Sequence, residues 1–506
     1  MPTPLAAAAD SRGTDFWLGF PAAENPISGS PALRLLITAP TAASGVVSVP
    51  GTAFSENFAV GPESPTSVDL PESVELETAD SVTSGKGIHV TASSPIAVQA
   101  LFQAEGLSDG YLALPTSLLG TAYLVLDYPG NADCGEAEFE IVGTQAATTV
   151  TIVPSVAIGG HAAGVPYEIS LGAGSTYLGQ ASGTNATTGT SITADKPVAV
   201  LGGNSCAQVP VGTLAANYIV EQMPPTSVWG NDFSLMPFAG RTSGDQVTLL
   251  GSADGTSVSV TGASGTPGGA PTSLNAGQGV TFTIDESIRV TADKPILVAH
   301  FAQGEDAEEP SAPNPTGDPT MVLVPPHQRW HYTQSLSTPT SGFSQRYLNI
   351  VIATADLGTL RLDGAPVPAL SFAPVGNDPT VTGGRLAVGG GAHVLDAAGP
   401  FGVEVYGFEP NDAFGWPGAW GDGSRAPLLI PGGSVAAGSG SKCRVPKLKR
   451  KRLAAARKAL RRNGCRLGRV KKRKGATLKT GRVVRQKPAA GKTLRAGAKV
   501  SVVLDD

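Results

Sequence analysis

The chain is short of charge, aromatic side chains and cysteine, and these shortages exclude several classes of protein. Of its 506 residues, 15% are charged, 6% are aromatic and four are cysteines, while 41% are hydrophobic. That hydrophobic fraction is enough to fill a core, which argues against a disordered chain. No apolar run reaches the ~18 residues that a membrane-spanning helix needs, so no such helix is predicted.

Catalytic and cofactor-binding motifs are also missing. The sequence has no GxSxG, no P-loop and no paired-carboxylate pattern, so no catalytic residue, cofactor or metal site is predicted. His327 and His331 in HQRWH have the spacing of zinc-binding helices, but they lack the following glutamate and lie in a proline-flanked strand. The acidic loop that starts at Glu305 lacks the ligand spacing of an EF-hand. We expect ordinary polar loops or strand edges at both places.

Basic residues are scarce in the first 441 residues and abundant after them. Residues 1–441 hold 12 Lys and Arg against 39 acids, a net charge of −27. Residues 442–506 hold 24 Lys and Arg against two acids, a net charge of +22. This asymmetry indicates an acidic body joined to a basic module.

The acidic body repeats itself about every 100 residues. One phrase starts at His89 (HVTASSPIAVQALFQ), Ser191 (SITADKPVAVLGG), Arg289 (RVTADKPILVAHFAQ) and, in degraded form, His393. Each copy predicts two strands around a turn, with a proline at the junction. Glycine and proline, about a fifth of the chain, fit many short strands joined by tight turns.

The fold is therefore expected to be mainly β, with four repeats of two strand-rich units each. A closed β-propeller is favoured over tandem β-sandwiches. The reason is a second repeated phrase, which starts at Tyr111 (YLALPTSLLGTAYLVL), Tyr218 and Thr320. The last repeat has only its first half, AFGWPGAW from Ala413, and GTDFWLGFP, from Gly13, matches the missing half. We expect Phe16–Phe20 to pair near Val403–Trp416 and so to remove an open sheet edge.

The basic module reads as a small α+β domain. VPKL, from Val445, predicts a strand, and LAAARKALRRNG, from Leu453, predicts a helix whose apolar face ends at Gly464. GRVVRQ, from Gly481, and KVSVVL, from Lys499, predict two further strands. Together these segments resemble a PASTA domain. The resemblance implies an extracellular module that contacts the bacterial cell wall, in particular peptidoglycan.

The body resembles the amino-terminal domain of the IgGFc-binding protein family, including its bacterial members. The resemblance rests on GTDFWLGFP at the start, NSCAQVP from Asn204, VEQMPPTSVWGNDF from Val220 and FGVEVYGFEPNDAFGWPG from Phe401. It implies a secreted, non-enzymatic recognition or adhesion domain.

Four segments follow from these readings. Residues 1–12 are a leader remnant or a flexible N-terminus, 13–420 the repeated β domain, 421–441 a Gly/Ser-rich linker and 442–506 the PASTA-like domain. The cysteines fall two to a module, which predicts disulfides Cys134–Cys206 and Cys443–Cys465 in an oxidising compartment. Four unrelated thiols are the alternative.

We therefore expect a secreted bacterial cell-surface binding or adhesion protein, not an enzyme, whose β body recognises a protein or glycan. The module would hold it to a wall polymer, peptidoglycan or an anionic glycan. The residues expected to contact that polymer are Arg450, Lys451, Arg457, Lys458, Arg461, Arg462, Lys471, Lys472, Arg473 and Lys474. The module has no aromatic residue for base stacking, so no specific nucleic acid is expected. Alternatives are an extracellular hydrolase of wall polymers or a structural surface-layer protein.

Overall fold

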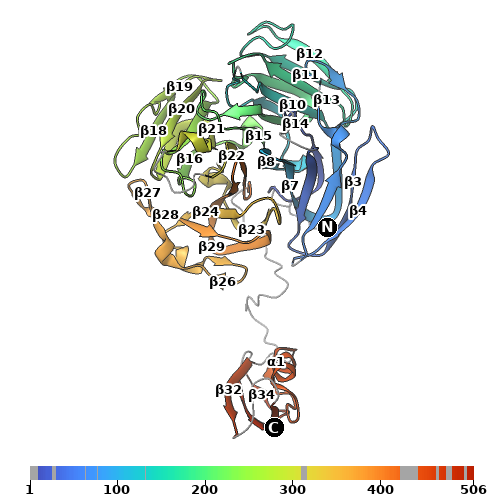
Figure 1. The fold of residues 1–506 in the computed structure, drawn as a ribbon, viewed down its shortest axis with the longest axis vertical. Coiled ribbons are helices and arrows are strands. Elements are labelled where there is room, and N and C mark those ends of the chain that lie inside the picture. The colour runs from blue at the N-terminus through green and yellow to red at the C-terminus, as the bar shows by residue number, and fades with distance from the viewer. Residues whose placement is uncertain are drawn as a thin grey trace, which may run out of the picture. The chain divides into compact units, whose positions relative to one another are not determined.

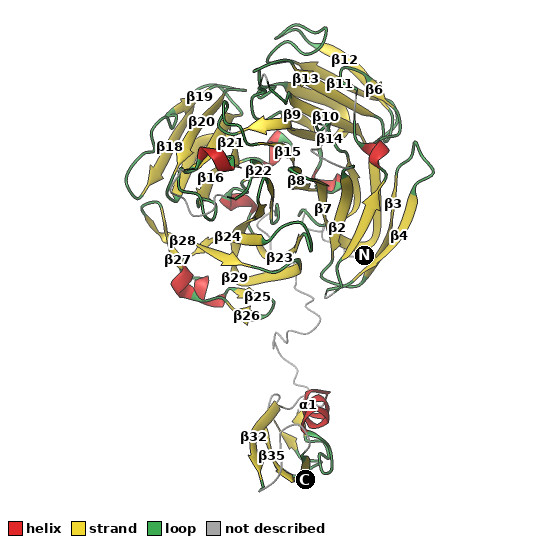
Figure 2. Cartoon of the chain, in the orientation of Figure 1, coloured by secondary structure: helices red, strands yellow, loops and turns green. Residues whose placement is uncertain are grey.

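The computed structural model describes residues 10–421 and 443–505, except for 25–29, 63, 77, 132, 309–315, 463–465, 474–480 and 495–498. It divides into two units, Met1–Pro431 and Gly432–Asp506, which we call the body and the basic module. The described residues of the body are mainly strand, with short 3-10 turns, and α1 (Leu453–Arg462) belongs to the basic module (Figure 2). The predicted linker lies outside the described residues, apart from Gly421, and so do residues 1–9 of the predicted N-terminal segment.

The described strands of the body form four large sheets (Figure 1). The first contains β1 (Gly13–Leu18), β2 (Ala32–Thr38), β3 (Ala43–Ser48), β4 (Ser55–Val60), β5 (Thr66–Leu70), β7 (Ile88–Ala104) and β8 (Leu107–Leu112). The second contains β6 (Val82–Thr83), β9 (Gly120–Leu124), β10 (Ala137–Gly143), β11 (Thr148–Val153), β12 (Tyr167–Leu171), β13 (Thr176–Ala181), β14 (Ser191–Gln208) and β15 (Ala216–Gln222).

The other two sheets follow the same plan. The third contains β16 (Gly230–Leu235), β17 (Asp245–Gly251), β18 (Thr256–Gly262), β19 (Ser273–Leu274), β20 (Gly279–Ile284), β21 (Ile288–Ala302) and β22 (Thr320–Leu323). The fourth contains β23 (His331–Thr338), β24 (Gln345–Ala353), β25 (Arg361–Leu362), β26 (Ala365–Pro366), β27 (Phe372–Val375), β28 (Asp378–Ala387), β29 (Gly391–Glu409) and β30 (Asp412–Pro417). The 3-10 turns are η1 (Glu72–Val74), η2 (Thr116–Leu118), η3 (Thr226–Val228), η4 (Glu305–Ala307), η5 (His327–Arg329), η6 (Leu357–Thr359) and η7 (Ala369–Ser371).

One long strand is the spine of each sheet, and it comes from the first repeated phrase. The predicted turn is wrong, because β7, β14, β21 and β29 each run through the proline without a break. In β7 the first half pairs with β1 and β3, while the second half pairs with β2 and β8. The proline of β7 lies where the strand changes from one pair of neighbouring strands to the other, and the pairing with β1 shifts register there. Proline is tolerated at such an irregularity because no regular hydrogen bond requires its missing N–H.

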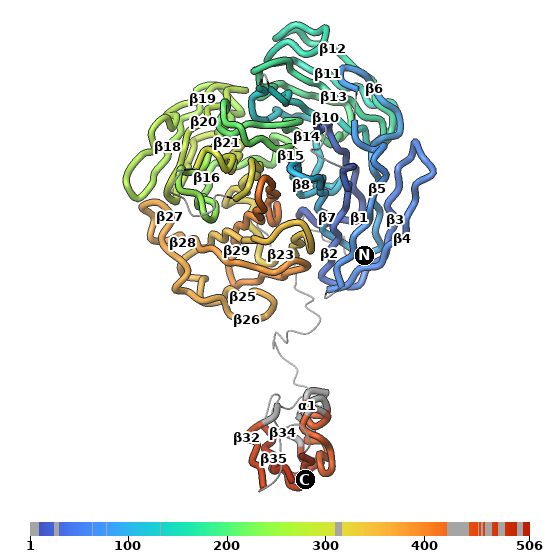
Figure 3. Tube along the Cα trace, in the orientation of Figure 1, coloured from blue at the N-terminus to red at the C-terminus, as the bar shows by residue number. Residues whose placement is uncertain are grey.

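The expected pairing of the N-terminal strand with the last repeat is also wrong. Strand β1 pairs with β7 inside the first sheet, with Phe16 opposite Val90 (Figure 3). The fourth sheet already has its own equivalent in β23, which pairs with β29. The second phrase is split between sheets, so that β8 ends the first sheet and β9 begins the second. In the part of the chain that the structure describes, β23 thus takes the place that the N-terminal strand was expected to fill.

The four sheets instead meet through β8, β15, β22 and β30, which we call the inner strands. Strand β8 contacts β15 and β30, and β22 contacts the same two strands. The start and end of the described body also meet, because the Ser11 backbone N–H donates to the Trp420 carbonyl oxygen at 2.7 Å. The first sheet therefore touches the fourth as well as the second.

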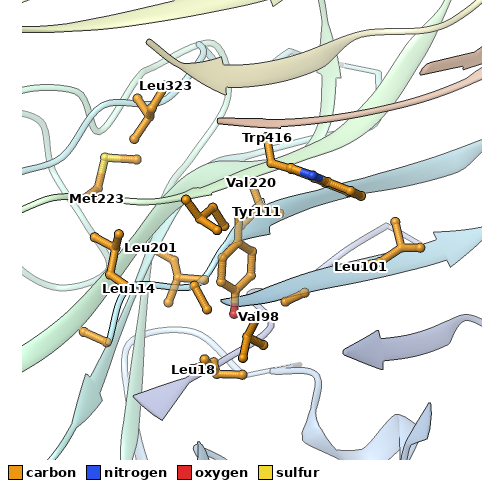
Figure 4. Packing of buried hydrophobic residues seen from close by; sticks show 14 of the residues in the cluster. Leu18, Val98, Leu101, Tyr111, Leu114, Leu201, Val220, Met223, Leu323 and Trp416 are labelled. Carbon is orange, nitrogen blue, oxygen red and sulfur yellow. The ribbon is translucent and has the colours of Figure 1, made fainter. Parts of the chain in front are cut away.

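The largest apolar cluster of the described residues contains side chains of the inner strands and of the strands packed against them. Tyr111 on β8 is fully buried, and its ring points toward Val98 and Leu18 of the first sheet, while Trp416 of the last sheet belongs to the same cluster (Figure 4). Its hydroxyl group donates to the Gly19 carbonyl oxygen at 2.7 Å. Burial of side chains from both chain ends in one cluster is the main apolar force that joins the sheets.

Candidate functional site

The basic module is a small sheet with one helix against it. It contains β31 (Cys443–Arg444), α1, β32 (Arg466–Lys472), β33 (Arg482–Lys487), β34 (Thr493–Leu494) and β35 (Lys499–Asp505). Strand β35 pairs parallel to β32 and antiparallel to β33. The strand predicted at VPKL lies two residues earlier, because β31 covers Cys443–Arg444 and only Val445 continues its backbone pairing, with Lys492 and Gly491, each at 2.8 Å. The Leu448 N–H donates instead to the Gln486 side chain at 2.7 Å.

The predicted helix and its apolar face are found. Leu453, Ala456 and Leu460 of α1 are buried, as their i, i+3, i+7 spacing requires. They pack with Val445, Leu448, Val483, Val500, Val502 and Leu504 in a core that belongs to the module alone. This core places the hydrophilic residues of the module on its outside.

The structure exposes part of the predicted cationic surface. Arg450, Lys451, Lys471, Lys472 and Arg473 are exposed, and among them Arg473 forms an ion pair with Asp505 at 2.9 Å. Positions Arg457, Lys458, Arg461 and Arg462 lie on α1 without a description of their side chains, and Lys474 lies outside the described residues. With two acids in 65 residues, the module cannot neutralise itself, so its exposed cations suit a polyanion.

The body holds the expected Cys134–Cys206 disulfide. Asn131 donates its side-chain amide to the Cys206 carbonyl oxygen at 2.7 Å, and the Cys206 N–H donates to Asn204 Oδ1 at 2.8 Å. The bridge therefore fastens the loop before β10 to the long strand β14. The predicted Cys443–Cys465 bridge cannot be placed, because Cys465 lies outside the described residues.

A buried polar centre, which the sequence did not signal, joins the inner strands. Asp109 on β8 accepts hydrogen bonds from the Val220 N–H at 3.4 Å, the Thr320 hydroxyl group at 2.7 Å and the Gly415 N–H at 2.9 Å. These donors come from the other three inner strands. Burial raises the pKa of Asp109 well above its usual range, and the hydrogen bonds oppose that rise.

The two histidines of HQRWH do not share a site. His327 lies in η5 against the Trp330 ring, whereas His331 begins β23 and is 3.2 Å from the Asp10 carboxylate. Among the described residues there is no group of three or more His, Cys, Asp or Glu side chains that fits a metal ion. Much of the acidic loop after Glu305 lies outside the described residues.

His327 instead completes a Ser–His–Asp arrangement that the sequence did not reveal. Its Nε2 is 3.0 Å from the Ser234 hydroxyl group, and its Nδ1 is 3.4 Å from the Asp232 carboxylate. Burial lowers the pKa of His327 to about 4, which keeps the ring neutral but weakens it as a base. Asp232 is also bound by Arg289 through two nitrogens at 3.0 and 2.9 Å.

Another sheet repeats part of this arrangement without a nucleophile. Asp15 on β1 accepts hydrogen bonds from the Thr116 hydroxyl group of η2 and is 2.9 Å from His89. Asp15 and Asp232 hold matching positions, since each precedes a buried phenylalanine in the first strand of its sheet. The carboxylate therefore fixes a 3-10 turn to the sheet in both places.

Two family models match the chain in order. The IgGFc binding protein model matches residues 109–407, and the PASTA domain model matches residues 444–506. No helix among the described residues is long and apolar enough to cross a membrane.

A human protein and a solved structure are among the matches to this chain. The human protein, named IgGFc-binding protein, is 30% identical over 300 residues, which is 58% of this chain and 5% of the human protein. This chain thus spans a small part of that relative. A crystal structure of a Corynebacterium diphtheriae protein, named as membrane anchored, covers 81% of this chain and 100% of its own at 11% identity. Its TM-score of 0.09 is too low to support a comparison of folds.

Proposed function

Since the chain belongs to the IgGFc-binding protein family, we propose that it is a secreted, non-enzymatic binding protein of the bacterial cell surface. The body recognises a protein or a glycan, and the basic module attaches the chain to peptidoglycan or to an anionic wall glycan. The observation that carries the attachment is the cationic surface on a module that has its own apolar core.

Electrostatic attachment has a measurable signature. Exposed Lys and Arg side chains bind a polyanion with an affinity that falls as salt screens the charges. Arg450, Lys451, Lys471 and Lys472 are exposed, and they can be replaced without disturbing the core. The body keeps its net negative charge and is expected to avoid the same polymer.

The test is co-sedimentation of the full-length chain with purified peptidoglycan, with and without its anionic polymers, between about 0.05 and 0.5 M salt. We expect retention at low salt, loss at high salt and loss when Arg450, Lys451, Lys471 and Lys472 are all changed to Gln. A control variant carries Arg34→Gln and Arg361→Gln in the body. No retention of the full chain at low salt would overturn the attachment.

The recognition role of the body is tested separately. The human relative's name points to the Fc part of IgG, so immobilised IgG Fc is the first protein probe. A chain that ends at residue 431 is expected to keep every ligand of the body, because the module has a separate core. If the truncated chain lost the ligands of the body, the proposal that recognition resides in the body and attachment in the basic module would be contradicted.

We further propose that the four sheets close into a propeller-like ring in which the first and fourth sheets meet while each keeps its own strands. The support is the mutual contact of the inner strands and the hydrogen bonds of Asp109 to three of them. Asp109→Asn places an amide N–H₂ against these donors, so it is expected to lower stability by about 2–4 kcal/mol. Asp285→Asn on the exposed surface is the control. Equal stability of the two variants in thermal unfolding would argue against a ring held at this residue.

Hydrolysis of wall polymers is a second candidate, and one observation favours it. Ser234 lines a small pocket and contacts His327, which contacts Asp232. A fluorophosphonate probe labels a serine that is activated in this way. Labelling of the wild-type chain that disappears in Ser234→Ala would establish a reactive serine, and absence of labelling would leave Asp232 and His327 as supports of the η5 turn.

A further inference from the structure

The hairpins that lead into the four inner strands end at one face of the body. The Asn217 side-chain amide near the start of β15 donates to the Ser108 carbonyl oxygen of β8 at 2.7 Å and to the Pro319 carbonyl oxygen before β22 at 2.9 Å. The Ser108 hydroxyl group donates to the Asp412 carboxylate at the start of β30 at 2.8 Å. These bonds hold the strand starts together, so the loops before them share one surface. We call the described loops 105–106, 209–215, 303–308 and 410–411 the hairpin face.

The hairpin face presents two large apolar side chains to solvent. Val211 is 49% exposed and Leu214 is 88% exposed, and they are two of the five large apolar residues that are exposed among the described residues. Their loop is fixed, because the Leu214 and Ala215 backbone N–H groups donate to the two Asp306 carboxylate oxygens at 2.6 and 3.0 Å. An apolar side chain that a rigid loop holds in water is preorganised to contact a partner.

Carboxyl groups without counter-ions lie beside these side chains. Four of them form no ion pair among the described residues: Glu305, Asp306, Asp318 and Asp412. The nearby Arg241 is buried and already paired with Glu308 at 3.5 Å. Burial, together with repulsion from Glu305 and Asp412, raises the pKa of Asp318 to about 8. A cation that arrives at this face would relieve that repulsion.

The apolar and acidic residues together select the chemistry of a partner. Leu214 gains from contact only with another apolar group, and the carboxylates favour Lys or Arg. A polyanion is repelled by the net charge of −27 on residues 1–441. Among the described residues no group of three or more His, Cys, Asp or Glu side chains fits a metal ion, so a metal is not the partner inferred here. The surface therefore fits a protein segment that carries Lys or Arg beside apolar side chains.

We propose that the hairpin face binds a partner protein through such a basic and apolar segment. The inference rests on the proposed recognition role of the body, and it names a protein as the partner. Leu214 and Val211 supply the apolar contact, while Glu305 and Asp306 attract the cationic side chains.

The test measures binding of labelled peptides to the full-length chain by fluorescence anisotropy, at about 0.15 M salt. The first peptide is an amphipathic sequence of Leu and Lys, the second has Gln in place of every Lys, and the third has Ser in place of every Leu. We expect the first peptide to bind more tightly than either of the others, because it alone offers both kinds of contact.

Two variants with matched controls locate the contact. Leu214→Ser is expected to weaken binding of the first peptide about tenfold or more, whereas Leu370→Ser, at an equally exposed leucine of η7, should bind as wild type does. Glu305→Gln should also weaken binding, and Asp285→Asn on another exposed surface should not. Thermal unfolding shows whether each chain is folded, and little loss is expected for either leucine variant because both side chains are exposed.

Three results would overturn the proposal. The first peptide fails to bind the wild-type chain, the three peptides bind equally, or Leu214→Ser binds the first peptide as well as Leu370→Ser does. Immobilised IgG Fc is tested on the same samples. If Fc binds while the first peptide does not, this surface is rejected and the recognition role of the body stands. If neither binds, both this surface and Fc as a ligand of the body are rejected.

Discussion

At the scale of single residues, buried carboxyl groups without partners set how stability depends on pH. Glu140 on β10 is fully buried, and neither of its carboxyl oxygens has a hydrogen-bond partner among the described residues. The position of the Glu140 carboxyl group also requires glycine at position 19, since a Cβ there would collide with it. Burial raises the pKa of Glu140 from 4.5 to about 8, against the opposing charge of Lys86.

The raised pKa of Glu140 predicts that the protein loses stability as the pH rises. The folded chain holds this proton up to about pH 8, whereas the unfolded chain releases it near 4.5. The stabilisation is therefore complete below pH 4.5 and falls through the interval, by at most about 1.4 kcal/mol per pH unit. Glu140→Gln should flatten this slope and raise the Tm relative to wild type near pH 8.

The measurement is thermal unfolding of both chains from about pH 5 to pH 8. His300 contributes a slope of the same sign, because its pKa is raised to about 9 by Glu404 and Asp245 against the effect of burial. The difference between Glu140→Gln and wild type isolates Glu140. Glu168→Gln on the exposed side of β12 is the control, and an equal slope in all three chains would contradict the assignment.

At the scale of elements, the repeated phrases predicted the strands well and their pairing poorly. Alternating apolar residues identified the strand-rich units, because a half-buried strand imposes period two on its own sequence. The proline inside each long strand suggested a turn, yet β7 and its equivalents pass through it. Partners in these sheets are set by residues far apart in sequence, such as Phe16 and Val90, and local spacing carries no information about them.

The candidate sites show the same limit. The cationic surface was predictable, because composition alone reveals it. Asp109 and the Ser234–His327–Asp232 arrangement were not, since their contacts join residues far apart in sequence, 211 positions for Asp109 with Thr320 and 93 for Ser234 with His327. Local sequence patterns do not encode contacts between distant residues, so only the three-dimensional structure identifies these sites.

The Cys134–Cys206 bridge links the loop before β10 to strand β14 of the second sheet. It closes a loop with a sequence separation of 72 residues, and closing such a loop typically stabilises a protein by about 2–4 kcal/mol. Replacing both cysteines by serine is expected to lower the Tm of the body and to leave the basic module unchanged. Thermal unfolding of the wild-type chain with and without reductant checks the result, and the double variant should not respond to reductant in the body transition.

At the scale of the whole molecule, the charge asymmetry separates the stability of the two units. The core of the basic module contains no residue of the body, so the units are expected to unfold in separate transitions. The module carries a net charge of +22 on 65 residues, and like charges on a small domain repel one another in the folded state.

Salt is therefore expected to raise the Tm of the basic module by screening this repulsion, from about 0.05 to about 0.5 M. Calorimetry of the full-length chain measures both transitions in one experiment, and Asp109→Asn identifies the body transition by lowering it alone. Replacing Arg450, Lys451, Lys471 and Lys472 by Gln should raise the module's Tm at low salt and reduce its response to salt, because fewer charges remain to be screened. A module whose Tm is indifferent to both salt and these substitutions would show that its cations are already neutralised within the folded chain, and the electrostatic basis of wall attachment would then be lost.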